Sequence, residues 1–126
     1  MSVLDASAVL ALIHTEPGHE LVAEKINGAV LGAANFAEVV GKLVDAQVDV
    51  RRLRELLSAA GVHIEPLTAD DAELAGALRA VGKGRSLSLG DRCCLALTTR
   101  MNPPEVLTAD RAWTEVALPI QVRLIR

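Results

Sequence analysis

Short apolar runs alternate with longer amphipathic segments along the whole chain. The segment 35–47 shows the helical pattern most fully, because its apolar residues recur at every third or fourth position. The members of this stripe are Phe36, Val39, Val40, Leu43 and Val44. The short apolar runs predict strands at residues 3–4, 29–31, 63–65, 105–107 and 120–124.

Turn and capping residues delimit the helices that lie between these strands. Pro17-Gly18 and Asn27-Gly28 are helix breakers, whereas Thr68 and Ser88 are suited to cap the N-termini of helices. We therefore predict helices at residues 6–13, 19–26, 35–47 and 50–60, from 68 to about 81, from 88 to about 100, and a short one opening at Asp110. Residues 82–86 are predicted to form a loop.

Strands that alternate with helices are the signature of a parallel sheet covered on both faces. The predicted fold is a three-layer α/β/α sandwich with a central parallel sheet. Its 126 residues suit a single domain spanning residues 1–126. Because ligands of such sheets gather at the carboxyl ends of the strands, functional residues are expected at that edge.

Four acidic residues are predicted to lie at this edge of the sheet. Asp5 follows the first strand and Asp110 follows the fourth, whereas Glu38 and Asp91 lie in the first turns of helices. Each residue also has a purely structural explanation. The three aspartates suit helix caps or first turns, and Glu38 lies opposite the apolar stripe of its helix, which favours solvent exposure.

Convergence of these carboxylates would require a cation or the uptake of protons. Two like charges about 4 Å apart repel by roughly 4 kcal/mol at an effective dielectric constant near 20. Oxygen ligands without His or Cys select hard ions such as Mg²⁺ or Mn²⁺. We expect Asp5, Asp91 and Asp110 to hold the ion, and Glu38 to complete a catalytic site that hydrolyses phosphodiesters by metal-activated water.

Nearby hydroxyl and basic residues are candidates for supporting roles. Ser7 and Thr108 each stand two residues from a site aspartate and are suited to orient a carboxylate or a metal-bound water, or simply to cap a helix. Four basic residues are expected to flank the cleft, where they either bind RNA phosphates or remain solvated surface charges: Lys83, Arg85, Arg92 and Arg111.

Composition narrows the possible partners and the compartment. The net charge of −3 argues against a general electrostatic nucleic-acid binder, and one Phe, one Trp and no Tyr cannot form a stacking platform for bases. No apolar run approaches the roughly 20 residues of a membrane span. The N-terminus has no basic region before its apolar run, so no secretory signal is expected. The adjacent Cys93 and Cys94 are read as reduced residues of a cytoplasmic protein.

Four segments of the chain resemble a known family. These are V-L-D-A-S-A at Asp5, A-A-N-F-A-E-V at Glu38, S-L-G-D-R-C-C-L-A-L at Asp91 and L-T-A-D-R-A-W at Asp110. They resemble the PIN domain and, more narrowly, the VapC-type toxins of bacterial type II toxin–antitoxin modules, over essentially the whole chain. The resemblance implies that the four acids match the family's metal site. It also implies a Mg²⁺- or Mn²⁺-dependent endoribonuclease with tRNA or rRNA as common targets, and a homodimer held inactive by a cognate antitoxin.

Other classes of protein remain open at this point. A phosphatase with an aspartyl nucleophile usually has a second acid two residues later, where this chain has Ser7. A non-toxin PIN-like nuclease that acts on other RNA or on DNA would need the same site chemistry. A non-catalytic acidic α/β interaction module would tolerate the loss of Glu38 or Asp110.

Overall fold

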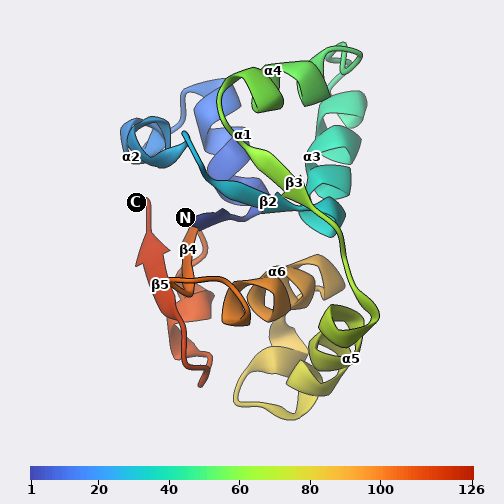
Figure 1. Cartoon of the computed structure of the whole chain (residues 1–126), viewed down its shortest axis with the longest axis vertical. Coiled ribbons are helices and arrows are strands. Elements are labelled where there is room, and N and C mark those ends of the chain that lie inside the picture. Colours follow the sequence, from blue (N-terminus) through green and yellow to red (C-terminus); the bar gives the residue numbers. More distant parts are fainter.

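A computed structural model describes all residues 1–126 and contains one five-stranded parallel sheet in the order β3-β2-β1-β4-β5. Helices cover both faces of this sheet, α1–α4 on one side and α5 and α6 on the other (Figure 1). The α/β/α sandwich with a central parallel sheet is therefore confirmed. The strands are β1 (Val3–Leu4), β2 (Val30–Gly32), β3 (His63–Glu65), β4 (Glu105–Thr108) and β5 (Gln121–Leu124).

The helices follow the predicted order with small shifts at their ends. They are α1 (Ala6–His14), α2 (His19–Lys25), α3 (Ala33–Asp45), α4 (Leu53–Ala59), α5 (Ala69–Ala77) and α6 (Leu89–Thr99). Three segments form short 3₁₀ turns, η1 (Leu78–Ala80), η2 (Gly84–Ser86) and η3 (Arg111–Glu115), where a longer helix, a loop and a short α-helix were predicted. Thr68 and Ser88 cap their helices as predicted, and each forms a capping box, with Asp71 and Asp91 respectively.

Alternate residues of the central strands point to opposite faces of the sheet and take part in two separate cores. One buried cluster joins the sheet to α1–α4, and the other joins it to α6 and to Trp113 of η3. The strand residues concerned are Leu4, Leu31 and Leu107 on the first face and Val3, Val30 and Val106 on the second. This alternation leaves the strand ends, and not the sheet faces, as the place for polar residues.

The register of the sheet brings the ends of β1 and β4 together. Leu4 pairs with Leu107, and the Asp5 backbone N–H donates to the Leu107 carbonyl at 3.2 Å. Asp5 and Thr108 are consequently neighbours, although they are 103 residues apart in the chain. Cys93 and Cys94 are free and buried. None of the helices combines the length and apolar character needed to cross a bilayer.

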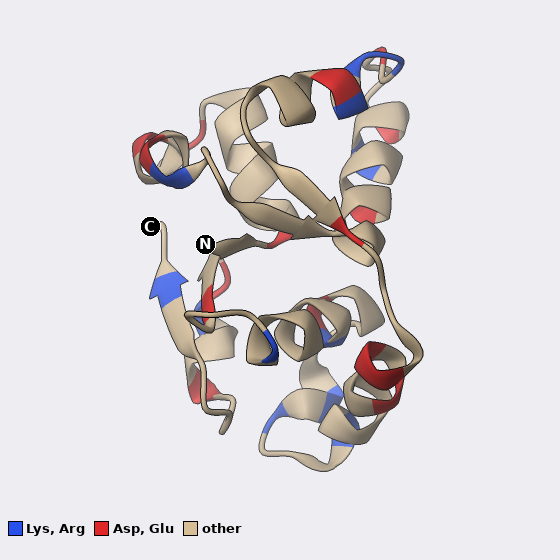
Figure 2. Ribbon diagram, viewed as in Figure 1, with Lys and Arg blue, Asp and Glu red and all other residues tan.

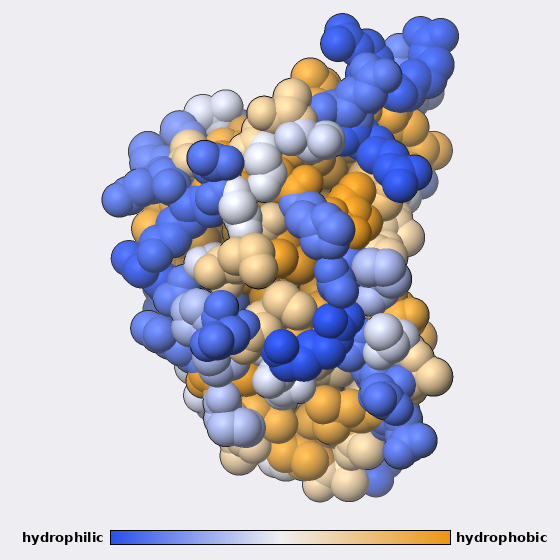
Figure 3. Space-filling view, viewed as in Figure 1, coloured by the Kyte–Doolittle hydropathy of each residue, from blue (hydrophilic) through white to orange (hydrophobic).

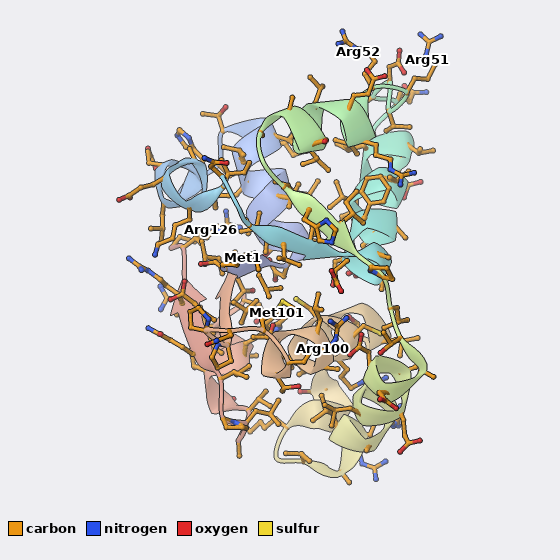
Figure 4. All side chains as sticks on the ribbon, viewed as in Figure 1. Met1, Arg51, Arg52, Arg100, Met101 and Arg126 are labelled. Carbon is orange, nitrogen blue, oxygen red and sulfur yellow. The ribbon has the colours of Figure 1, made fainter.

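An ion-pair network ties the end of α6 to α5 and β3. Arg100 donates to both carboxylate oxygens of Asp71 at 2.9 Å and to Glu65 Oε1 at 3.1 Å. Asp71 is only 4% exposed, and the hydrogen bonds from Arg100 hold its pKa below the usual range. Figure 4 shows Arg100 where α6 faces α5, whereas Arg51 and Arg52 project from the far end of the molecule. That end is strongly hydrophilic (Figure 3).

Substituting Arg100 by glutamine is expected to destabilise the fold. The loss should be about 2 kcal/mol, less than for a fully buried pair because the Arg100 side chain is 34% exposed. The pKa of Asp71 is depressed in the folded state, so this contribution is present above the ordinary carboxyl pKa and is lost as the pH falls through the lower folded value.

Urea unfolding at neutral and acidic pH measures this effect. Arg51→Gln is the matched control, because its ion pair with Asp49 is exposed and its loss should change stability little. An Arg100→Gln protein as stable as wild type at neutral pH would contradict the assignment.

Candidate active site

A cleft of about 440 Å³ lies at the carboxyl edge of the sheet. Eleven residues line it, and they include all four acidic residues expected from the sequence, Asp5, Glu38, Asp91 and Asp110. These four come from separate elements, and Figure 2 shows acidic segments from both halves of the chain around the middle of the molecule. The structure thus brings the four acids to one cleft.

Asp5 is the most constrained of the four acids. It is the N-cap of α1 and is 4% exposed. Its Oδ1 accepts hydrogen bonds from the Ala8 backbone N–H (2.8 Å) and the Ser7 hydroxyl (2.7 Å), and its Oδ2 accepts one from the Thr108 hydroxyl (2.5 Å). Burial raises its pKa to about 6 even though these three bonds lower it, and the charge of Asp91 adds to the rise.

Ser7 and Thr108 hold Asp5 against the segment that carries Asp110. The Ser7 oxygen also accepts from the Ala109 N–H at 2.9 Å, and the Thr108 oxygen accepts from the Asp110 N–H at 3.0 Å. Each hydroxyl therefore donates to one Asp5 oxygen and accepts from the loop after β4. The side-chain position of Asp5 and the backbone position of Asp110 are fixed by the same two groups.

Asp91 and Asp110 each cap a helical turn with one carboxylate oxygen and leave the other oxygen without a protein partner. Asp91 Oδ2 accepts from the Ser88 N–H at 3.2 Å in the capping box of α6. Asp110 Oδ1 accepts from the Ala112 N–H at 2.9 Å and caps η3. The second carboxylate oxygen of each residue accepts no hydrogen bond from the protein. The capping explanation and a role in the cleft are therefore compatible at both positions.

Glu38 lies in the cleft, contrary to the solvent-exposed position that the apolar stripe of its helix favours. Val44 of that stripe is 54% exposed, whereas Asn35, which lies outside the stripe, is buried, so the stripe does not mark the packed surface of α3. The side of α3 that carries Glu38 faces the start of α6. There, Asn35 Nδ2 donates to Glu38 Oε1 at 2.7 Å and to the Gly90 carbonyl at 3.0 Å.

The carboxylates share a cleft, but they are not assembled around a single point. No three His, Cys, Asp or Glu side chains are close enough together to hold one metal ion. The expectation that Asp5, Asp91 and Asp110 meet closely enough to ligate one ion directly is therefore not met. The physical reason is that each carboxylate is held by its own local hydrogen bonds, to Ser7 and Thr108 or to a helix cap.

The donor set nevertheless fits a hydrated hard cation. Every acidic residue offers oxygen alone, and Mg²⁺ in proteins usually keeps several waters and binds through one or two carboxylates. A cleft of about 440 Å³ has room for an ion with such waters. Asp91 and Asp110 have oxygens without protein partners, and the buried Asp5 carboxylate would be stabilised by a nearby positive charge.

None of the four basic residues expected to flank the cleft lines it. Arg92 is 7% exposed and donates to the Ala75 carbonyl at 2.7 Å, because the position after Asp91 on α6 faces α5. Lys83 pairs with Glu115 at 3.6 Å, away from the cleft. The expectation of RNA contacts is thus wrong for the buried Arg92, and Lys83, Arg85 and Arg111 lie outside the cleft.

Two other basic residues line the cleft, and the sequence pattern did not single them out. Lys42 lies one helical turn after Glu38 on α3, a spacing that could have indicated it. Arg126 follows β5, and its Nη1 lies 3.6 Å from Glu16 Oε1 and 3.3 Å from the Pro17 carbonyl. Figure 4 places Arg126 beside α2, at the end of the sheet where the chain emerges from β5.

The chain has the class of fold in which a parallel α/β/α sandwich binds its ligands at the carboxyl edge of the sheet, and in this chain that edge carries an acidic cleft. Within this class, residues 2–118 match the family model of the PIN domain, and the chain belongs to that family. The resemblance to the PIN domain found in the sequence is thereby confirmed. PIN domains are generally nucleases, and they generally use divalent metal ions.

Solved structures share this fold at low sequence identity. A toxin–antitoxin complex from Klebsiella pneumoniae aligns with a TM-score of 0.76 and 20% identity, over 100% of this chain and 98% of that one. VapBC2 from Rickettsia felis, bound to a DNA fragment from its promoter, aligns with a TM-score of 0.67 and 12% identity, over 98% and 97% of the two chains. A search of curated proteins found no match.

Proposed function

We propose that this protein is a VapC-type toxin, a metal-dependent endoribonuclease that hydrolyses RNA phosphodiester bonds. The observation that carries the proposal is the presence of Asp5, Glu38, Asp91 and Asp110, from four separate elements, in one cleft. Membership of the PIN family and structural likeness to two toxin–antitoxin complexes support it. We further propose that it works in the cytoplasm as a homodimer, is restrained by a cognate antitoxin, and cleaves tRNA or rRNA.

We assign different roles in the reaction to the side chains of the cleft. Asp5, Asp91 and Asp110 would hold a hydrated Mg²⁺ or Mn²⁺ without all three contacting it directly, and the ion when bound would polarise the phosphate and lower the pKa of water. Ser7 and Thr108 keep the Asp5 carboxylate oriented by one hydrogen bond to each oxygen. Glu38 Oε1 accepts from Asn35, and its Oε2 has no protein donor. We assign Oε2 to accept the proton of the attacking water.

Electrostatics explains how a chain of net charge −3 can act on RNA. The acidic cleft repels phosphate unless a cation is bound, so metal and substrate are expected to bind cooperatively. Lys42 and Arg126 are the basic side chains that line the cleft, and both lie where the flanking phosphates of a bound strand could reach. A stacking mode of recognition is not available to a chain with two aromatic residues.

Removal of divalent metal is expected to stop cleavage completely. Purified protein, freed of antitoxin, should cut structured RNA in Mg²⁺, lose activity in EDTA, and regain it with Mn²⁺, because without a bound cation the carboxylates of the cleft repel the phosphates of the substrate. The measurement is gel analysis of labelled RNA, with single-stranded and duplex DNA of the same sequence in parallel.

Each result of this experiment distinguishes one class of function. Cleavage that continues in EDTA would refute the metal-dependent mechanism. Cleavage of DNA in preference to RNA would favour a different PIN-like nuclease. No cleavage of either, at any metal concentration, would favour a non-catalytic interaction module.

A further inference from the structure

Asn35 is a buried polar residue that joins the two helices carrying Glu38 and Asp91. It is 2% exposed and lies in the first turn of α3. Its amide nitrogen donates to Glu38 Oε1 at 2.7 Å and to the Gly90 carbonyl at 3.0 Å. Both partners are oxygens that only accept, so the orientation of the amide is unambiguous. A single side chain thus links the first turn of α3 to the first turn of α6.

Gly90 provides the space in which the Glu38 carboxylate lies. A Cβ added at Gly90 would lie 2.4 Å from Glu38 Cδ and 2.5 Å from each of its carboxylate oxygens. Gly90 is not among the residues with positive φ, so its backbone conformation does not require glycine. Glycine weakens a helix relative to alanine. The close approach of Glu38 is therefore the structural reason for glycine at this position.

We propose that Asn35 and Gly90 form a cradle that positions the Glu38 carboxylate beside Asp91, so that the charge of Glu38, besides accepting the proton of the attacking water, strengthens the binding of a hydrated divalent cation at Asp91. The proposal rests on the proposed function and adds Asn35 to it as a positioning residue. Gly90 precedes Asp91 directly in α6, so a carboxylate seated on Gly90 adjoins the Asp91 turn. The Asn35 amide occupies Oε1 and leaves Oε2 available.

Holding two carboxylates next to each other is unfavourable unless a positive charge lies between them. A glutamate free on a helix surface would move away from Asp91 by changing its rotamer. The Asn35 amide prevents this movement, and the absence of a Cβ at Gly90 makes room for the constrained position. Groups that orient metal ligands in this way typically contribute 10–100-fold to metal affinity.

Binding of Mn²⁺ to the RNA-free protein tests the cradle directly. Asn35→Ala removes the amide, and Gly90→Ala fills the space in which Glu38 lies; each should weaken Mn²⁺ binding by roughly 10–100-fold in calorimetric titrations. Gly76→Ala is the matched control, because it also replaces a helical glycine but meets no atom within 4 Å. It should bind Mn²⁺ as wild type does.

Two further readouts distinguish positioning from a merely structural role. Unfolding in EDTA reports the stability of the metal-free fold. In cleavage assays, the variants should need a higher Mg²⁺ concentration for half-maximal rate, while the rate at saturating Mg²⁺ falls much less. Wild-type Mn²⁺ affinity in both variants, with or without loss of stability, overturns the cradle but leaves the nuclease proposal standing. Failure of the wild-type protein itself to bind Mn²⁺ overturns both.

Discussion

Replacing Asp5 by asparagine is expected to abolish RNA cleavage and, at the same time, to stabilise the metal-free protein at neutral pH. Burial raises the pKa of Asp5 to about 6 from an ordinary value of 3.8, so its ionised form is unfavourable in the fold. The difference between these two pKa values corresponds to a loss of at most about 3 kcal/mol of folding stability at neutral pH. Asparagine has nearly the same shape, carries no charge, and keeps an oxygen to accept from Ala8 and Ser7, while its NH₂ group can donate to the Thr108 hydroxyl oxygen in place of accepting from it.

The pH dependence of this effect has a definite sign. The folded state binds the Asp5 proton more tightly than the unfolded state does. The free-energy cost of ionising Asp5 in the folded protein is therefore absent below the unfolded pKa of 3.8. It develops as the pH rises and is complete above the folded pKa of about 6. The stability gained by Asp5→Asn should therefore be near zero in acid and largest at neutral and alkaline pH.

Urea unfolding in EDTA across this pH range measures the gain. Addition of Mg²⁺ should stabilise the wild-type protein more than Asp5→Asn, because the variant has one carboxylate fewer for the ion to stabilise. Asp45→Asn, at an exposed position near the end of α3, is the control and should alter neither stability nor cleavage. A variant that still cleaves RNA, or that is less stable than wild type in EDTA at neutral pH, would contradict the role given to Asp5.

The second large effect is expected at Asp91, where asparagine should reduce cleavage by about 10²–10³-fold or more while the fold keeps its stability. The Oδ2 atom of Asp91 accepts from the Ser88 N–H, and the oxygen of an asparagine can accept the same bond. The cap of α6 is then preserved. The oxygen that has no protein partner is the one replaced by NH₂, which cannot bind a cation.

Asp71 gives the opposite pattern and is the control for Asp91. It occupies the equivalent place in the capping box of α5, but its carboxylate pairs with Arg100 and lies outside the cleft. Asp71→Asn should lower stability and leave cleavage intact. Steady-state cleavage and urea unfolding of the two variants measure this contrast. Activity of Asp91→Asn at the wild-type level, or a loss that parallels unfolding, would remove Asp91 from the site.

Local sequence determined the order of elements and the edge of the sheet at which Asp5 and Asp110 lie. Strand length, helical periodicity and the caps at Thr68 and Ser88 are properties of neighbouring residues, so they can be read without knowledge of the fold. In a parallel sheet every strand ends at the same edge. The residue after a strand is therefore placed by the strand itself, which is why both aspartates were assigned correctly to that edge.

The tertiary structure alone decided which way the helical side chains face. Helical periodicity alone favoured solvent for Glu38, although its place in the chain suggested the site, and the packing of α3 against α6 placed it in the cleft. Arg92 was expected beside the cleft, but the packing of α5 against α6 buries it. The same packing brought Asn35 to Gly90, and the course of the chain after β5 brought Arg126 to the cleft. These positions depend on contacts between segments far apart in the chain. A sequence pattern describes one helix at a time, so it carries no information on the neighbour that the helix meets.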